Sequence, residues 1–394
     1  MKPINGGICA VKGVYSGGIK PGKMGLGIIK AEGSAAGVFT RNKVIAAPLV
    51  VTRKKIAETG SLSAVIMNSG NANAFTGEEG YADAEYMTEL LAEKLGTPKK
   101  LVGVASTGVI GRKLDTEWID RHIDEVLNSI SNSPENSNSA ARSIMTTDTF
   151  TKESAIELDC GVRIGGIAKG SGMIEPNMGT MLAFIYTDAI IGSDNLNKCL
   201  KTSVDRSFNM IVVDGDTSTN DMVLLTATGK SGVELDIHDF QKGIDYVLTD
   251  LARMIARDGE GATKLIEAKV EGAQTENDAQ LVAKAIVRSP LVKTAIFGKD
   301  PNWGRVIAAI GYSGADIEQD RISLSFSDNE NIIDLVTNGR ITKNDNESLD
   351  TLQNIMENKE IKIHINLGLK NKDATAWGCD LTYDYIKINA EYTT

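Results

Sequence analysis

Apolar and polar positions follow two periods along this chain of 394 residues. Short apolar runs, such as "SAVIM", "LVGVA" and "MLAFIY", have the length and composition of buried strands. Between such runs, the segments 81–96 and 116–130 carry the spacing and end signals of helices. Because the strands alternate with helices but are joined by many Gly-rich turns, the pattern predicts a mixed α/β sandwich rather than an all-parallel sheet.

The same pattern continues through the centre of the chain and changes near residue 277. Strands are predicted at "MLAFIYTDAII", "MIVVDGD" and "MVLLTATG", and helices over 194–208 and 238–257. Residues 131–139, "SNSPENSNS", have the composition of a surface loop. A helix in "NDAQLVAKAIVRS" followed by short alternating strands indicates a second unit, so the predicted domains are 1–276 and 277–394.

Composition and charge narrow the class of protein. Hydrophobic residues make up 42% and charged residues 24%, as in ordinary globular proteins. The net charge of −10 argues against broad nucleic-acid binding, which needs a basic face. No apolar stretch reaches the length of a membrane span, and the first residues lack the apolar core of a signal peptide. We therefore expect a cytoplasmic protein that acts on small molecules.

The cysteines and histidines show no pattern typical of a disulfide framework, a metal site or a catalytic base. Cys9, Cys160, Cys199 and Cys379 are scattered without a CxxC pair, which favours buried thiols in a reducing compartment over disulfides or a zinc site. None of the three histidines lies near a Gly-rich or Ser/Thr-rich turn, so structural or surface roles are expected for them: His122, His238 and His364.

The polar loop "DGDTSTND" (214–221) raises the question of a calcium site. An EF-hand needs glycine at its sixth position and glutamate at its twelfth, where this chain has Thr219 and Leu225. We therefore expect no metal there, and a catalytic nucleophile would need a base other than histidine.

One candidate nucleophile is Thr180, because the chain changes from glycines and short polar residues to an apolar run at Gly179-Thr180. A threonine hydroxyl needs a base, which leaves a lysine or its own α-amine. An α-amine has a pKa of about 7.7 and a lysine side chain a pKa of about 10.4, so the amine is far more often unprotonated at neutral pH. The amine is free only if the preceding bond is cut, and glycine gives the backbone freedom for that attack. The hypothesis is self-cleavage into 1–179 and 180–394; alternatively, the dipeptide only begins a buried strand.

Longer motifs around Gly179-Thr180 favour self-cleavage over a dipeptide that only begins a strand. The segment "KGSGMIEPNMGTML" resembles the processing site of the ornithine acetyltransferase family, the glutamate N-acetyltransferases of arginine biosynthesis. Further segments resemble that family in the same order and cover nearly the whole chain: "STGVIG", "MTTDT", "VDGDTSTND", "ARDGEGATK", "SPLVKTAIFGKDPNWGR" and "KINAEYTT". Most relatives carry alanine before the threonine, where this chain has Gly179.

The resemblance implies a fold and a set of site residues. The fold would be a layered α/β/β/α sandwich of the self-cleaving aminopeptidase and ornithine acetyltransferase type, with a smaller C-terminal α+β domain that contributes to the substrate site. Thr180 would be the nucleophile, and Thr107 and Gly108 would form the oxyanion hole. Substrate would be bound by Thr147 (or its neighbour Thr146), Lys169, Thr180, Glu260, Asn389 and Thr394.

The resemblance also implies a reaction. An acetyl group would pass from N-acetylornithine to glutamate through an acetyl-threonine ester, without a metal or a tightly bound cofactor, in an α2β2 heterotetramer of the cleaved chains. Some family members also take acetyl-CoA as donor. Two alternatives are a self-cleaving aminopeptidase or amidase, with water as acceptor, and a ligand-binding protein in which the bond stays intact.

Overall fold

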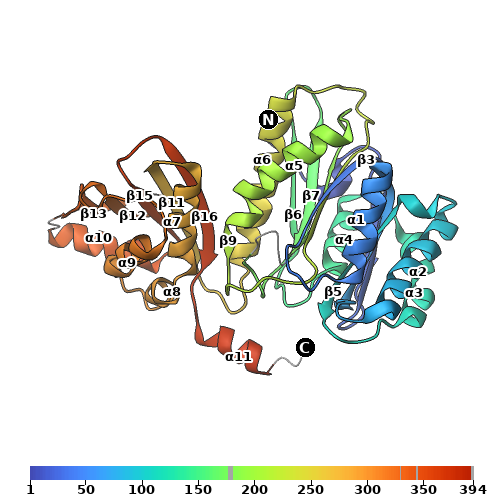
Figure 1. The fold of residues 1–394 in the computed structure, drawn as a ribbon, viewed down its shortest axis with the longest axis horizontal. Coiled ribbons are helices and arrows are strands. Elements are labelled where there is room, and N and C mark those ends of the chain that lie inside the picture. Colours follow the sequence, from blue (N-terminus) through green and yellow to red (C-terminus); the bar gives the residue numbers. More distant parts are fainter. Residues whose placement is uncertain (176–180, 329, 343–344, 392–394) are drawn as a thin grey trace. The chain divides into compact units, whose positions relative to one another are not determined.

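A computed structural model describes residues 1–175, 181–328, 330–342 and 345–391. The chain forms two compact units, each built on its own sheet (Figure 1). The first unit comprises Met1–Asn209 and Asp216–Ile255, and the second comprises Met210–Gly215 and the chain from Ala256 onward. The expected functional division into 1–276 and 277–394 remains a prediction.

Nine strands form the sheet of the first unit. In spatial order these are β1 (Lys2–Pro3), β6 (Lys152–Glu157), β7 (Arg163–Lys169), β8 (Leu182–Thr187), β10 (Met222–Ala227), β3 (Gly25–Phe39), β4 (Ser61–Asn71) and β5 (Val102–Val109), with β2 (Tyr15–Ile19) also paired to β3. The pairs β8–β10 and β4–β5 are parallel and the other pairs are antiparallel. The predicted mixed α/β class is confirmed.

The central strands β8 and β10 consist entirely of buried residues. Helix α6 (Ile237–Arg257) packs on the neighbouring β7. A Cβ at Gly166 of β7 would lie 2.8 Å from Leu251 of α6, so glycine allows this close approach. Helix α5 (Ser193–Arg206) packs against β3 and β10. The helices predicted over 194–208 and 238–257 are thereby confirmed.

Three further helices pack against β3, β4 and β5, namely α1 (Ala47–Thr59), α2 (Gly77–Leu95) and α3 (Thr116–Ser129). Their ends follow ordinary capping rules. Gly96 takes a left-handed conformation (φ 62°) after α2, and the Asp115 side chain accepts a hydrogen bond from the Trp118 N–H at the start of α3. The helices predicted over 81–96 and 116–130 are confirmed.

The surface loop predicted over 131–139 is wrong, because most of it lies in helix α4 (Pro134–Ser143). Ser133 caps this helix by accepting a hydrogen bond from the Asn136 N–H, and Pro134 occupies its first turn, where proline is tolerated. The polar residues that indicated a loop are therefore helix-start signals. Ala140 and Ala141 then anchor the helix in the core.

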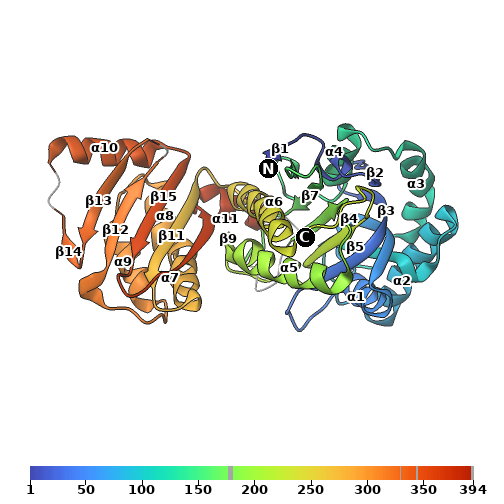
Figure 2. The same cartoon turned by 90° about the horizontal axis from the view of Figure 1, so that it is seen from above.

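Seven strands form the sheet of the second unit, where Figure 2 shows several of them side by side. Their order is β14 (Arg340–Ile341), β13 (Ile332–Thr337), β12 (Ser323–Ser327), β15 (Glu360–Asn366), β11 (Leu265–Ala273), β16 (Lys372–Cys379) and β9 (Ile211–Val212). The helices are α7 (Glu276–Arg288), α8 (Pro290–Phe297), α9 (Trp303–Tyr312), α10 (Asn346–Glu357) and α11 (Tyr383–Glu391). Among the described residues, 3-10 turns occur at Gly7–Ala10, Lys99–Leu101, Phe208–Met210 and Gln319–Arg321.

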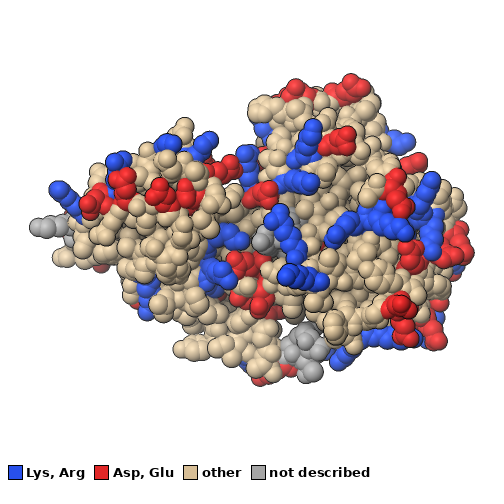
Figure 3. Space-filling view, in the orientation of Figure 1, with Lys and Arg blue, Asp and Glu red and all other residues tan. Residues whose placement is uncertain are grey.

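Other expectations have mixed outcomes. Cys9, Cys199 and Cys379 are buried free thiols as predicted, but Cys160 is exposed in the turn between β6 and β7. His122 pairs with the Trp118 carbonyl and His364 with the Ser327 hydroxyl, which are structural roles. Within the described part of the chain, no helix is long and apolar enough to cross a membrane. On the face drawn in Figure 3, acidic side chains lie among the basic ones.

Candidate active site

The candidate site is built on one edge of the first sheet. Lys169, the last residue of β7, pairs with Leu182, the first residue of β8, and Leu182 pairs with Met222, the first residue of β10. The end of β7 and the starts of β8 and β10 therefore meet at this edge. Gly179, Thr180 and Thr394 lie outside the described residues. Met181, which directly follows the predicted nucleophile, is buried at the same edge.

Lys169 is a buried cation, 6% exposed, and not a surface lysine beside a turn. Its ammonium group donates a hydrogen bond of 2.9 Å to the Thr146 hydroxyl and lies 3.9 Å from the Asp148 carboxylate. Of the two threonines that the sequence left open, Thr146 contacts Lys169. Thr147 lies beside it and is partly buried.

The side chain of Asp148, which forms this ion pair with Lys169, is fully buried. The Lys152 ammonium lies 2.7 Å from one carboxylate oxygen, which also accepts the Gly170 N–H, and the Thr146 N–H donates to the other oxygen. Burial by itself would raise the pKa of Asp148, but the two lysines and the Gly170 N–H lower it to about 2. The carboxylate therefore stays charged and fixes Lys169 in place.

A third lysine adds positive charge nearby. The Lys20 ammonium donates a hydrogen bond of 2.9 Å to the Ser69 hydroxyl on β4. Burial lowers the pKa of Lys20, and the charges of Lys169 and Arg142 lower it further, while Asp148 opposes the change. Lys20 and Lys169 thus lie within electrostatic reach of each other, in surroundings suited to an anionic substrate group.

Thr107 and Gly108 lie near the end of strand β5, where they pair with Ser69 and Gly70 of β4. Gly108 has φ +132°, which residues with a side chain rarely adopt. A Cβ at Gly108 would lie 2.4 Å from the Gly70 carbonyl carbon, so this position requires glycine. An oxyanion hole needs hydrogen-bond donors such as two adjacent backbone N–H groups, and this role of Thr107 and Gly108 remains a prediction.

Asn220 connects this strand end to the start of β10. Its side-chain amide donates to the Ser106 carbonyl at 2.8 Å and to the Ala72 carbonyl at 2.6 Å. The next residue, Asp221, is 2% exposed, and its carbonyl accepts the Thr40 N–H. The Met222 N–H in turn donates to the Met181 carbonyl. Asn220 and Asp221 therefore link the segment before Thr107 to the residue after Thr180.

Two predicted substrate residues contact each other in the second unit. The Asn389 amide of α11 donates a hydrogen bond of 2.8 Å to the Glu260 carboxylate. Gly261 has φ +68°, and a Cβ there would lie 2.5 Å from the Tyr385 nitrogen of α11. The glycine after Glu260 therefore lets α11 pack closely enough to bring Asn389 to the carboxylate.

Several residues at the site were missed from the sequence: Lys20, Asp148, Lys152, Asn220 and Asp221. Three of them lie within motifs that the sequence had singled out, "MTTDT" and "VDGDTSTND", so a closer reading of those motifs could have found them. Lys20 and Lys152 carry no local signal. Lys20 is held by Ser69 of β4, which lies far along the chain, whereas Lys152 pairs with Asp148 only four residues before it.

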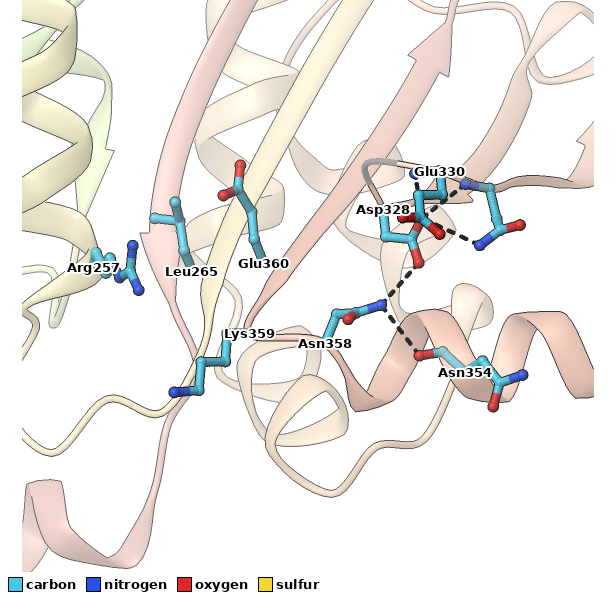
Figure 4. A pocket seen from close by; sticks show the side chains of 9 residues that line it. Arg257, Leu265, Asp328, Glu330, Asn354, Asn358, Lys359 and Glu360 are labelled. Carbon is cyan, nitrogen blue, oxygen red and sulfur yellow. Dashed lines mark hydrogen bonds between the residues drawn. The ribbon is translucent and has the colours of Figure 1, made fainter.

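The structure also contains a cavity. It has a volume of about 590 Å³ and lies in the second unit (Figure 4). It is lined by Arg257, Leu265, Asp328, Glu330, Asn331, Asn354, Asn358, Lys359 and Glu360. None of these is a predicted site residue, so the cavity carries no argument about the reaction. Among the described residues, no cluster of His, Cys, Asp and Glu could hold a metal ion.

Comparison with known proteins bears on the whole chain. Residues 11–394 match the model of the ArgJ family. The chain is 63% identical to the glutamate N-acetyltransferase of Methanosarcina mazei over the full length of both, and 49% identical to the arginine biosynthesis bifunctional protein ArgJ of Archaeoglobus fulgidus over 98% of this chain and 100% of that protein. A crystal structure of arginine biosynthesis bifunctional protein argJ from Bacillus halodurans superposes with a TM-score of 0.51 at 45% identity, covering 54% of this chain and 100% of that chain. The chain therefore belongs to the ArgJ family.

Proposed function

We propose that this chain transfers an acetyl group from N-acetylornithine to glutamate through an ester on Thr180, as a step of arginine biosynthesis. The predicted activity is confirmed by glutamate N-acetyltransferases that match the chain from end to end. The observation that carries the proposed mechanism is the sheet edge where Lys169 and Met181 meet, with Asn220 joining it to the Thr107 segment.

In the first half-reaction, Gly179 and Thr180 are already separated by self-cleavage. The Thr180 hydroxyl oxygen attacks the acetyl carbonyl carbon, and the new α-amine of the same residue takes the hydroxyl proton. Thr107 and Gly108 donate hydrogen bonds to the oxyanion, each worth about 3 kcal/mol. The amine then passes the proton to the departing ornithine nitrogen, and an acetyl-threonine ester remains.

Substrate recognition follows from charge. Lys169 binds the α-carboxylate of the amino-acid substrate, supported by Asp148 and by the hydroxyl of Thr146 or Thr147. Glu260, held by Asn389, binds an ammonium group, and Thr394 adds a further contact.

In the second half-reaction, glutamate occupies the same site and its amine nitrogen attacks the ester carbonyl carbon. The bond from that carbon to the Thr180 oxygen breaks, and the α-amine of Thr180 carries a proton from the glutamate nitrogen to the freed hydroxyl, which gives ping-pong kinetics. We further propose an α2β2 heterotetramer of the two cleaved chains, located in the cytoplasm, where the free thiols of this chain stay reduced. Acetyl-CoA is a second donor to be tested on the same protein.

The test separates transfer from hydrolysis. Purified protein receives N-acetylornithine and glutamate, and acetylglutamate and free acetate are measured together. We expect acetylglutamate as the main product, whereas mostly acetate would support the aminopeptidase or amidase alternative. Thr180→Ala should give one uncleaved chain without transfer activity. Transfer by that variant would refute the nucleophile assignment.

A further inference from the structure

A groove in the first unit lies at the sheet edge that carries the candidate active site. Phe39, at the end of β3, pairs with Met222 at the start of β10, which pairs in turn with Leu182 of β8. The groove has a volume of about 360 Å³, which is within the range of small-molecule sites. None of the residues assigned to acetyl transfer lines it. Its lining residues are Gly37, Val38, Phe39, Thr40, Arg41, Arg53, Lys201 and Asp205.

The charge of this groove differs from that of the whole chain. Three of its lining side chains are cations, Arg41, Arg53 and Lys201, against one carboxylate, Asp205. The chain as a whole has the opposite balance, with 42 basic and 52 acidic residues. On the face drawn in Figure 3, basic side chains lie over both α1 and α5, which supply Arg53 and Lys201. Because a concave surface lined by cations concentrates anions, the groove is suited to a negatively charged ligand.

Two of these cations have no acidic partner within the part of the chain that the structure describes. Arg53 and Lys201 are both exposed, and neither forms a salt bridge with a described carboxylate. Asp205, which lies one turn after Lys201 on α5, accepts a hydrogen bond of 2.7 Å from the Asn209 side chain instead. The ammonium of Lys201 and the guanidinium of Arg53 are therefore available to the anionic groups of a ligand.

Arg53 is oriented before any ligand binds. Its guanidinium carbon lies 5.3 Å from the centre of the Phe39 ring. A Cβ at Gly37 would lie 2.8 Å from the Phe39 Cζ atom, so glycine leaves room for this ring. Thr40 fixes the end of the strand, because its N–H donates to the Asp221 carbonyl at 2.9 Å. An arginine that stacks on an aromatic ring keeps the N–H groups in its plane free to donate to anionic oxygens.

We propose that this groove binds the phosphate groups of a small organic molecule. Arg53 donates paired hydrogen bonds to phosphate oxygens, and Lys201 and Arg41 supply further positive charge. Phosphate groups fit better than a single carboxylate, because three cations around one groove match a ligand with several negative charges. Such a ligand is either an acyl carrier that bears phosphates or a free nucleotide. The groove is distinct from the Lys169 site and goes beyond the proposed transfer between amino acids.

Isothermal titration calorimetry of the purified full chain tests this site with coenzyme A and ATP as probes. Both should bind the wild type, and their affinity should fall as salt is added. Lys201→Ala and Arg53→Ala should each weaken binding about fivefold or more, through the loss of one charge-assisted contact. The matched control is Lys198→Ala, which removes an exposed lysine of the same helix that does not line the groove and should bind normally.

Two further probes identify the source of the phosphate groups. Pantetheine, which is the part of coenzyme A without any phosphate, should not bind, and inorganic pyrophosphate should bind more weakly than the organic probes. Tighter binding of coenzyme A than of ATP supports the acyl carrier, and the reverse order supports a free nucleotide. Pantetheine that binds as well as coenzyme A would overturn the proposal, and so would pyrophosphate that binds more tightly than both organic probes.

The variants supply the remaining outcomes. Absence of binding by coenzyme A and ATP would overturn the proposal, as would equal losses in Lys198→Ala and Lys201→Ala. If Arg53→Ala does not fold, the comparison of these two lysine variants decides alone, because both side chains are exposed. Transfer from N-acetylornithine to glutamate should be unchanged in Lys201→Ala. Absence of transfer in the wild type would reject the proposed function and leave the binding result for the groove intact.

Discussion

At the scale of single residues, the site depends on charges held away from water. Lys169 is buried beside the Asp148 carboxylate, which also forms an ion pair with Lys152. Removing one partner from such a group leaves an unpaired buried charge, which costs far more than the pair contributes as a whole. Asp148 is therefore expected to matter for stability as well as for binding.

The pKa of Asp148 makes this testable. Its pKa is about 2 in the folded protein against 3.8 ordinarily, so its stabilisation is complete above pH 4 and is lost as the pH falls toward 2. At about 1.4 kcal/mol for each pH unit, the loss is about 2 kcal/mol. Urea unfolding of wild type and Asp148→Asn should show a stability gap that narrows by this amount between pH 5 and pH 2. A gap that stays constant would contradict the pairing.

At the scale of elements, the hydrophobic pattern predicted most helices and core strands well, because amphipathic spacing and Gly end signals are local. It failed at α4, where serine, asparagine and proline begin a helix but also typify loops. Strand "MIVVDGD" was predicted longer than β9, which pairs only over Ile211–Val212. The motifs predict Lys169 and Thr107 as site residues, but their neighbours on other segments, such as Asp148 and Asn220, could not be found without the tertiary structure.

The capping role of Ser133 gives a prediction for α4. Ser133→Ala removes the side-chain acceptor for the Asn136 N–H and should lower the free energy of unfolding by about 1 kcal/mol. Self-cleavage should be unchanged, since the substitution lies at the first turn of the helix and away from β8. Denaturant melts with electrophoresis of the same samples measure both. An unchanged melting midpoint would mean that the cap contributes nothing to stability.

At the scale of the whole molecule, the predicted site residues are distributed over two compact units, each with its own sheet. The first unit holds the predicted oxyanion residues and Lys169, and the second holds the contacting pair Glu260 and Asn389. The assignment of site residues to both units could be predicted only from the family resemblance, since no spacing or periodicity links residue 107 to residue 389. The central requirement of the proposed mechanism is cleavage of the peptide bond between Gly179 and Thr180.

Intact-mass measurement of enzyme that has just been shown to transfer acetyl groups tests this requirement most directly. The account predicts two polypeptides, one ending at Gly179 and one beginning at Thr180, whose masses add up to the full chain plus one molecule of water. A single unbroken chain in a fully active sample would contradict it.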